Sequence, residues 1–126
     1  MSDPPPPERF EERIWDLRER ADRDVAAFDP PSDPPNPDEA MTYLTEGAGP
    51  AVALYVEART GDHMLHFPPD QYHALEGAMN DWFDIYAGCY GVDLEADFVI
   101  RTAAEALLDT ENIHDVARVL TGVPGR

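Results

Sequence analysis

An apolar stripe in the second half of the chain constrains the fold more than any other feature. Its six members are spaced 3, 4, 3, 4 and 3 residues apart: Tyr72, Leu75, Met79, Trp82, Tyr86 and Cys89. This spacing places them on one face of an α-helix and is typical of helices that pack against other helices. Prolines precede the stripe and glycines follow it, so the pattern predicts a helix over 72–90.

A second apolar stripe lies near the start of the chain. Its spacings of 4, 3, 4, 4 and 3 residues join Phe10, Ile14, Leu17, Ala21, Val25 and Phe28. The opposite face is charged, which is typical of a surface helix over 8–28. We expect residues 1–7 to be a disordered Pro-rich lead and residues 8–126 to form a single helical domain.

Five prolines fall between Asp29 and Glu39. Proline fixes φ and removes a donor, so residues 29–37 are predicted to form an extended Pro-rich strap ahead of a helical core over 38–122. Asn36 as N-cap, Pro37 at the first helical position and Glu39 two residues later predict the start of a short helix. We expect Gly47 to end this helix, and the sequence Gly47–Pro50 to be a turn between two helices.

Residues 50–59 are open to two interpretations. Pro50 at a helix start, several alanines and Gly61 after the end favour a helix from Pro50 to Arg59. Val52, Leu54 and Val56 alternate, however, and a turn at 60–62 would join them to the following residues as a β-hairpin over 52–67. The chosen fold class is a single all-α domain of about five helices, and the alternative is an α+β fold with that one hairpin.

Two further helices are predicted near the end of the chain. Asp93 is a suitable N-cap for a helix over 94–108. Thr110 is the expected N-cap of a last helix, whose apolar positions follow helical spacing: Ile113, Val116, Ala117 and Leu120. Gly122 is expected to end it.

The charge balance excludes several classes of function. The 26 acidic residues outweigh 9 arginines, lysine is absent, and the formal net charge is −17. Nucleic acids and anionic membranes both require clustered basic residues, so neither is an expected partner. The longest purely apolar run, Ala51–Val56, is far shorter than the roughly 20 residues of a membrane span. With no secretory signal at the start and a single cysteine, we expect a cytoplasmic protein.

The acidity is spread through every segment, aspartate outnumbers glutamate, and all basic residues except histidine are arginine. In these features the chain resembles the small acidic proteins of unknown function of haloarchaea that accumulate salt. The resemblance implies an interior of molar salt, where charges interact over only about 3 Å. It transfers no site residues. Acids interleaved with apolar residues are typical of solvated helix faces rather than of a nucleic-acid mimic.

One cluster holds residues that ligate metals: Asp62, His63, His66, Asp70 and His73. Zinc binds such side chains, but two histidines three residues apart share a face only on a helix. The residues before Pro68 are expected to be extended. We therefore expect no metal and no other cofactor, and keep His63, His66, Asp70 and His73 as the candidate ligands of the alternative function, a small metal- or ligand-binding domain or enzyme.

Two other residues with reactive side chains have simpler roles. Cys89 lies on the apolar stripe, so we expect it to pack in the core rather than act as a nucleophile. His114 and Asp115 are adjacent on a helix, where side chains point about 100° apart, so they do not form an oriented acid–base pair. We expect that the protein is not an enzyme.

The aromatic residues indicate the most favoured function. Core packing is the first interpretation of Trp82, Phe83, Tyr86 and Tyr90, and a partner-facing surface is the second. Trp15 lies on the flank of the first helix, beside its apolar stripe. We therefore predict a non-enzymatic protein–protein interaction or assembly module, with these five residues as contacts to a partner protein or to a second copy of the chain.

Overall fold

The computed structural model describes residues 7–59 and 67–124, and within them the chain is helical with no strand. The helices are α1 (Pro7–Ala27), α2 (Pro37–Tyr43), the π-helical turn η1 (Leu44–Ala48), α3 (Gly49–Arg59), α4 (Pro69–Cys89), α5 (Ile100–Thr110) and α6 (Ile113–Thr121). The all-α prediction is confirmed. The hairpin alternative is wrong where it can be checked, since α3 is helical to Arg59. Residues 60–66, with the predicted turn, lie outside the described residues.

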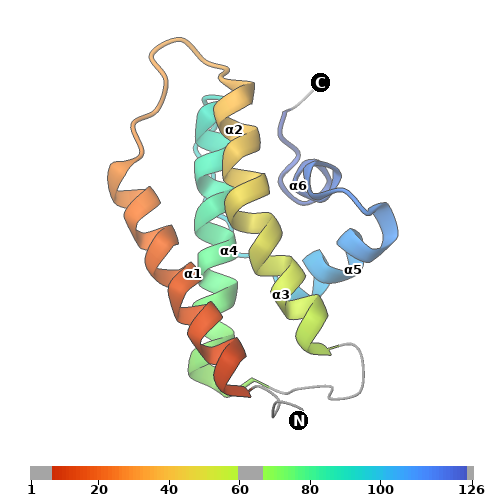
Figure 1. Cartoon of the computed structure of the whole chain (residues 1–126). Helices are drawn as coiled ribbons and strands as arrows, with labels where there is room; N and C mark the ends of the chain where they lie inside the picture. Colours follow the sequence, from red (N-terminus) through yellow and green to blue (C-terminus); the bar gives the residue numbers. More distant parts are fainter. Residues whose placement is uncertain (1–6, 60–66, 125–126) are drawn as a thin grey trace.

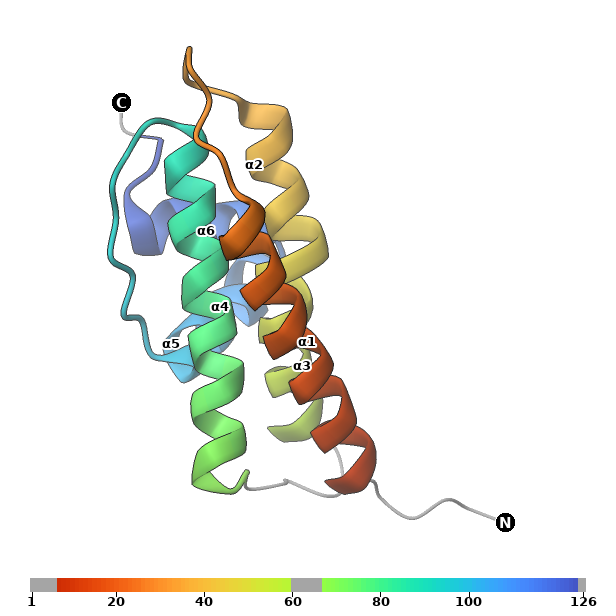
Figure 2. The ribbon, with the colours of Figure 1, turned by 90° about the vertical axis from the view of Figure 1, so that its left-hand side faces the viewer.

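Three long helical rods lie side by side, and two shorter helices flank them (Figures 1 and 2). Two of the rods are α1 and α4, which run along each other. α2, η1 and α3 join into the third rod, which we call the α2–α3 rod (Figure 1). α5 and α6 pack on the side of α3 and η1. The core between these elements includes the largest fully buried side chains: Trp82, Tyr86, Phe83, Ile14, Leu44, Leu54, Leu75, Met79 and Ile100.

α1 follows its predicted apolar stripe with two differences at its ends. Phe10, Ile14, Leu17 and Ala21 are buried, whereas Val25, near the end of the helix, is 47% exposed. The helix begins at Pro7, which the sequence had assigned to the lead, because proline is readily accommodated in the first turn of a helix. The rest of the predicted lead, 1–6, lies outside the described residues.

The predicted cap of α2 is confirmed. The side chain of Asn36 accepts a hydrogen bond from the Glu39 amide at 3.3 Å and donates one to the Glu39 carboxylate at 3.2 Å. The Asn36 amide donates to the carbonyl of Cys89 at 2.7 Å, which ties the end of the Pro-rich strap to the end of α4.

The prediction that Gly47 ends a helix, and that Gly47–Pro50 is a turn, is wrong. The chain passes from α2 into α3 through one π-helical turn, in which the Gly49 amide donates to the carbonyl of Leu44, five residues earlier. A Cβ on Gly49 would lie 2.7 Å from that carbonyl oxygen, so glycine permits the wider turn. Pro50 has no N–H for the carbonyl of Glu46, and Arg20 Nη2 of α1 donates to this oxygen at 2.5 Å instead.

The predicted helix over 94–108 begins later than expected, because residues 92–99 are not helical and α5 starts at Ile100. Asp93 therefore caps no helix. In this extended segment Leu94, Ala96 and Phe98 are half-buried, and the residues between them are exposed. This alternation with a period of two is the pattern of a strand lying on a surface.

Polar side chains of α4 hold this segment in place. The α4 polar stripe consists of Glu76, Asn80 and Asp84, four residues apart. The Ala96 amide donates to Asp84 Oδ1 at 2.6 Å, and the Ile100 amide donates to Glu76 Oε2 at 2.9 Å. Between them Asn80 bonds both backbone groups of Phe98, accepting from its amide at 2.8 Å and donating to its carbonyl at 3.0 Å.

The spacing of these bonds has a geometric cause. Four residues of an α-helix rise about 6.0 Å, and two residues of an extended chain span roughly 6.6 Å. Every second amide of the segment therefore meets the next member of the α4 polar stripe as the segment runs antiparallel to α4 (Figure 2). The segment takes its hydrogen bonds from α4 rather than from a helix of its own.

The last helix is capped by Asn112 and not by Thr110. The side-chain oxygen of Asn112 accepts from the amides of His114 and Asp115, at 2.8 Å and 3.1 Å. Thr110 is the last residue of α5, and its hydroxyl donates to the carbonyl of Ala106 at 2.8 Å. Gly122 ends α6 with a φ of 72°, as predicted.

Candidate functional site

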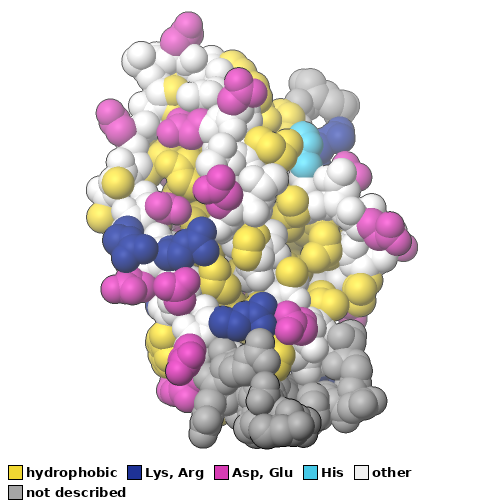
Figure 3. Space-filling model, viewed as in Figure 1, with side chains coloured by type: hydrophobic (Ala, Val, Ile, Leu, Met, Phe, Trp, Pro, Cys, Tyr) yellow, Lys and Arg dark blue, Asp and Glu magenta, His cyan; other side chains and the backbone are white. Residues whose placement is uncertain are grey.

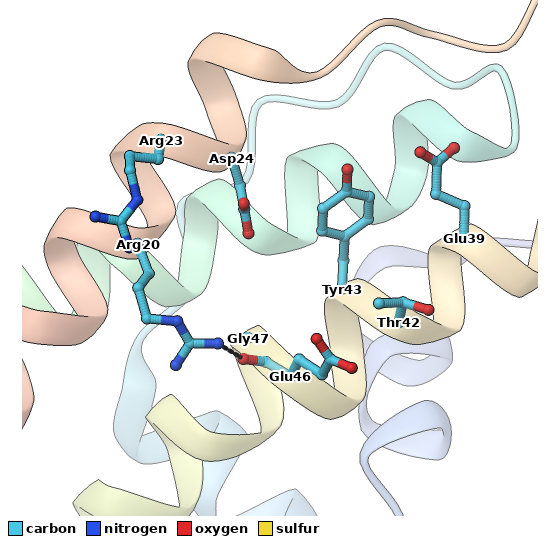
Figure 4. Close-up of a pocket in the computed structure, with 8 residues that line it drawn as sticks. All are labelled: Arg20, Arg23, Asp24, Glu39, Thr42, Tyr43, Glu46 and Gly47. Carbon is cyan, nitrogen blue, oxygen red and sulfur yellow. Dashed lines mark hydrogen bonds between the residues drawn. The ribbon is translucent and has the colours of Figure 1, made fainter.

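A groove between α1 and the α2–α3 rod is the candidate site. Its upper hollow, of about 310 Å³, is lined by Arg20, Arg23 and Asp24 of α1 and by Glu39, Thr42, Tyr43, Glu46 and Gly47 of the rod (Figure 4). A lower hollow, of about 350 Å³, is lined by Glu12, Arg13, Asp16, Leu17, Arg20, Pro50 and Leu54. The two hollows share Arg20 as a lining residue, and together we call them the groove.

The central tryptophan, Trp82, lies against residues that line the upper hollow. Trp82 is fully buried, and its indole N–H donates to Asp24 Oδ2 at 2.8 Å. A Cβ on Gly47 would lie 2.5 Å from the indole ring, so only glycine lets the π-helical turn lie against it. The bond from Trp82 to Asp24 thus connects the core to a carboxylate of the groove.

Each arginine of the groove has a partner within the chain. Arg20 donates to the carbonyl of Glu46, and its guanidinium lies 5.9 Å from the centre of the Trp82 ring. Arg13 forms a two-pronged ion pair with Glu57, at 3.0 Å and 3.2 Å. Arg23 lies 3.9 Å from Glu19, at the limit of an ion pair.

The carboxylates of the groove are less well partnered. Asp24 accepts from Trp82, and Glu39 belongs to the cap of α2. For Glu12, Asp16 and the Glu46 side chain, the described part of the chain provides no hydrogen bond or ion pair. Figure 3 shows carboxylates and arginines together over α1 and the α2–α3 rod. The groove therefore offers free negative charge, while its positive charge is already engaged.

Tyr43 adds a neutral donor to the upper hollow. Burial raises its pKa, and the charges of Glu39 and Asp24 raise it further. The phenol accordingly stays protonated at neutral pH. Its ring meets Phe28 edge to face, with 6.1 Å between the ring centres. Such a hydroxyl can bind a polar ligand but does not act as a base.

The predicted metal ligands are only partly visible. Asp70 and His73 lie exposed in the first two turns of α4, while Asp62, His63 and His66 lie outside the described residues. Within residues 7–59 and 67–124, no three histidine, cysteine, aspartate or glutamate side chains are grouped to hold a metal ion. Metal binding by the histidine cluster belongs to the alternative function, and that alternative stays untested.

Cys89 packs in the core, as predicted. It is fully buried, and its Sγ lies 3.9 Å from Glu39 Oε1. Burial, followed by the charge of Glu39, raises the pKa of the thiol to about 12. His114 packs edge to face on Tyr86 at 6.3 Å, and its side chain forms no hydrogen bond with Asp115 in the structure. Neither residue has the surroundings of a catalytic group.

The predicted partner contacts fall into two groups. Trp82, Phe83 and Tyr86 are fully buried, and Tyr90 is half-buried against Tyr86 with ring centres 5.4 Å apart. In the folded chain the first three are closed to a partner, which agrees with the core-packing interpretation. Trp15 is 40% exposed and lines neither hollow of the groove, so its role as a contact stays a prediction.

Sequence reasoning missed the groove, although one signal for it was present. The residues of its α1 wall were interpreted only as the charged face of a surface helix. Pro50, placed four residues after Glu46 inside a continuous helical pattern, leaves the Glu46 carbonyl without its usual donor. Such a carbonyl indicates that a side chain from elsewhere must reach it, and here that side chain is Arg20.

Comparison with known proteins identifies the family but no characterised relative. Neither the search of curated proteins nor the search of solved structures found a match. No helix in the described residues is long and apolar enough to cross a membrane. The model of one family, the domain of unknown function DUF8055, matches residues 8–125. The chain therefore belongs to the DUF8055 family.

Proposed function

We propose that this domain is a non-enzymatic interaction module whose groove binds a basic segment of a partner protein. The observation that carries the proposal is the imbalance within the groove. Arg20 binds the carbonyl of Glu46, Arg13 pairs with Glu57 and Arg23 lies 3.9 Å from Glu19, whereas the carboxylates of Glu12, Asp16 and Glu46 have no partner among the described residues. A segment with closely spaced arginine or lysine side chains complements this surface.

The net charge of the chain favours a different protein over a second copy as the occupant. Two copies would each bring a formal charge of −17, since 26 acidic residues outweigh 9 arginines in each chain. Like charges placed against each other at an interface oppose association. A basic partner is attracted by the negative electrostatic field of this chain, which accelerates association.

We further propose that this binding takes place in a salt-rich cytoplasm, since the composition resembles that of haloarchaeal proteins. Molar salt screens charges beyond about 3 Å and removes most of the long-range attraction. Direct contacts then decide the affinity. Two-pronged bonds from arginine to a carboxylate survive screening better than distant charge pairs, so we expect arginine to be preferred over lysine.

The test uses a capped nonapeptide with arginine at alternate positions, and the same peptide with neutral citrulline in place of each arginine. The two tryptophans report the site by NMR. The Trp82 indole N–H is bonded to Asp24 in the groove, and Trp15 lines neither hollow. We expect the arginine peptide to shift the Trp82 indole and the η1 amides and to leave the Trp15 indole unchanged, in 0.1 M and in 2 M KCl.

Charge-removing variants provide the matched controls. Glu46→Gln and Asp16→Asn should each weaken the arginine peptide about threefold, the range of an exposed ion pair. Asp109→Asn removes an exposed carboxylate of α5 and should change nothing. Equal weakening by Asp109→Asn, equal binding of the citrulline peptide or a shift confined to Trp15 would each contradict binding in the groove. Light scattering that showed a dimer dissociated by Glu46→Gln would favour a second copy as occupant instead.

A further inference from the structure

A third hollow lies at the C-terminal end of α4 and is separate from the groove. Its volume is about 310 Å³. Phe28 and Pro30, from the segment after α1, form one wall, and Val92 and Leu94, from the segment after α4, form another. Its lining is therefore largely apolar, and it lies where the two extended segments of the chain approach each other.

Two glycines shape this hollow. A Cβ on Gly88 would lie 2.8 Å from the Phe28 ring, so glycine allows the ring to lie close against α4. Gly91 has a φ of 79°, in the left-handed region that glycine adopts readily, and it turns the chain back along α4. The ring of Phe28 and the turn at Gly91 thereby form two walls of the hollow.

Two carboxylates, Asp84 and Asp93, lie among these apolar walls, and none of the residues that line the hollow is basic. Asp84 Oδ1 accepts from the Ala96 amide, and the described residues provide no partner for its second oxygen. Burial raises the pKa of Asp84, and the charges of Asp81, Glu95 and Asp93 add to this effect. A cation in the hollow would relieve this uncompensated charge.

We propose that this hollow binds a small alkylammonium group, with the ammonium between Asp84 and Asp93 and the alkyl chain along Phe28 and Leu94. Carboxylates supply the charge-assisted hydrogen bonds that an ammonium needs, and an aromatic face attracts cations as well. The apolar walls bury the methylene groups. The chain contains no lysine, so the ligand belongs to another molecule: a free amine or the side chain of a lysine.

The experiment compares four probes of similar length by NMR titration. They are n-pentylammonium, capped lysine, n-pentanol and n-pentanoate, with the amides of Gly88 and Gly91 as reporters. We expect both ammonium probes to shift these amides with saturable binding, and pentanol and pentanoate to bind at least about tenfold more weakly. The relative affinity of the two ammonium probes identifies the free amine or the lysine side chain as the source. Equal binding of pentanol, or no saturable binding of either ammonium probe, would overturn the proposal.

Two variants separate this site from general attraction to an acidic surface. Asp93→Asn removes a carboxylate of the hollow and should weaken pentylammonium about threefold. Asp97→Asn removes an exposed carboxylate of the same segment that does not line the hollow, and it should leave the affinity unchanged. Equal loss in both variants would contradict a defined site. Because neither residue lines the groove, the outcome is independent of the peptide test.

Discussion

The two sides of α4 hold the rest of the chain by different means. On one side the α2–α3 rod packs through apolar contact, with Gly47 lying against the Trp82 ring. On the other side the amides of Ala96, Phe98 and Ile100 donate hydrogen bonds to Asp84, Asn80 and Glu76, and the Phe98 ring packs edge to face on Phe83. One side depends on shape, and the other depends also on matched donors and acceptors.

The difference shows that a buried helix can organise two kinds of neighbour at once. Close packing tolerates small changes in polarity but not in volume, because interiors are filled to crystal-like density. An extended backbone that is bonded to side chains tolerates changes in side-chain volume better, but each lost hydrogen-bond partner leaves a backbone polar group unsatisfied. Substitutions on the two sides should therefore fail for opposite reasons.

The largest effect is expected at Asn80, which is only 8% exposed. Asn80→Leu keeps the approximate volume but leaves the amide and the carbonyl of Phe98 without partners. Unsatisfied buried groups cost about 1–3 kcal/mol each, so we expect a loss of about 3 kcal/mol in the free energy of unfolding. Urea denaturation followed by circular dichroism measures it. A loss below about 1 kcal/mol would mean that water replaces the side chain.

Gly47→Ala comes next and tests the packed side. The added Cβ would meet the Trp82 ring at 2.5 Å, and overpacking of this kind costs about 1–3 kcal/mol. Gly77→Ala on α4 is the control, because its Cβ meets only the end of the long Arg18 side chain, whose guanidinium pairs with Asp22 and Asp81. Alanine favours helix by about 1 kcal/mol, so this control should be neutral or stabilising. Equal melting temperatures for the two variants would contradict the shape argument.

Two substitutions of Asp84 separate the contribution of its hydrogen bond to stability from the contribution of its charge. Asp84→Asn keeps an acceptor for the Ala96 amide and removes the repulsion from neighbouring acids, so stability at pH 7 should hold or rise slightly. Asp84→Ala loses the acceptor and should cost about 1 kcal/mol. Thermal unfolding at pH 7 compares the two variants with the parent chain. If Asp84→Asn lost as much stability as Asp84→Ala, the charge of Asp84 would be the stabilising feature.

The pH dependence of Asp84 has a definite sign. Its pKa is raised in the folded chain from an ordinary value of 3.8, so the folded state binds the proton more tightly than the unfolded state. As pH falls from 7 through the raised pKa towards 3.8, the parent chain should therefore gain stability relative to Asp84→Asn. Parallel denaturation curves of the two proteins measure this difference. A relative loss over that window would show that the bond to Ala96 dominates.

Trp15→Ala should have the smallest effect, because the Trp15 side chain is 40% exposed. We expect a loss of no more than about 1 kcal/mol, from partial burial of the ring. Thermal unfolding measures it and provides a baseline for the other variants. A loss comparable to that of Gly47→Ala would mean that the ring supports the packing of α1.

The sequence was informative where helical periodicity and capping residues act locally. The stripes of α1 and α4 and the Asn36 cap were predicted because each signal lies within a few residues of its effect. The extended segment was missed because Leu94, Ala96 and Phe98 alternate with acids, a period of two that was taken as the start of a helix. Its partners in the α4 polar stripe lie 12 to 24 residues away, and their role depends on the fold.

The candidate groove could not be predicted from the sequence, for a related reason. The π-helical turn forms where Gly49 and Pro50 interrupt the regular bonding, and its free carbonyl is served by Arg20, 26 residues earlier. Patterns of polarity do not distinguish an arginine that crosses to another helix from one that faces solvent. The sequence therefore predicted the helices that form the groove but not the bonds that define it.

The extended segment should leave a distinctive trace in hydrogen–deuterium exchange. Its donors to α4 alternate along the chain, since the amides of Ala96, Phe98 and Ile100 are bonded to side chains. The amides of Glu95, Asp97 and Val99 are not held by the α4 polar stripe. Protection should therefore rise and fall with every residue, and the slow sites should all release together when α4 opens. A stretch without regular secondary structure would then exchange together with the helix that holds its amides.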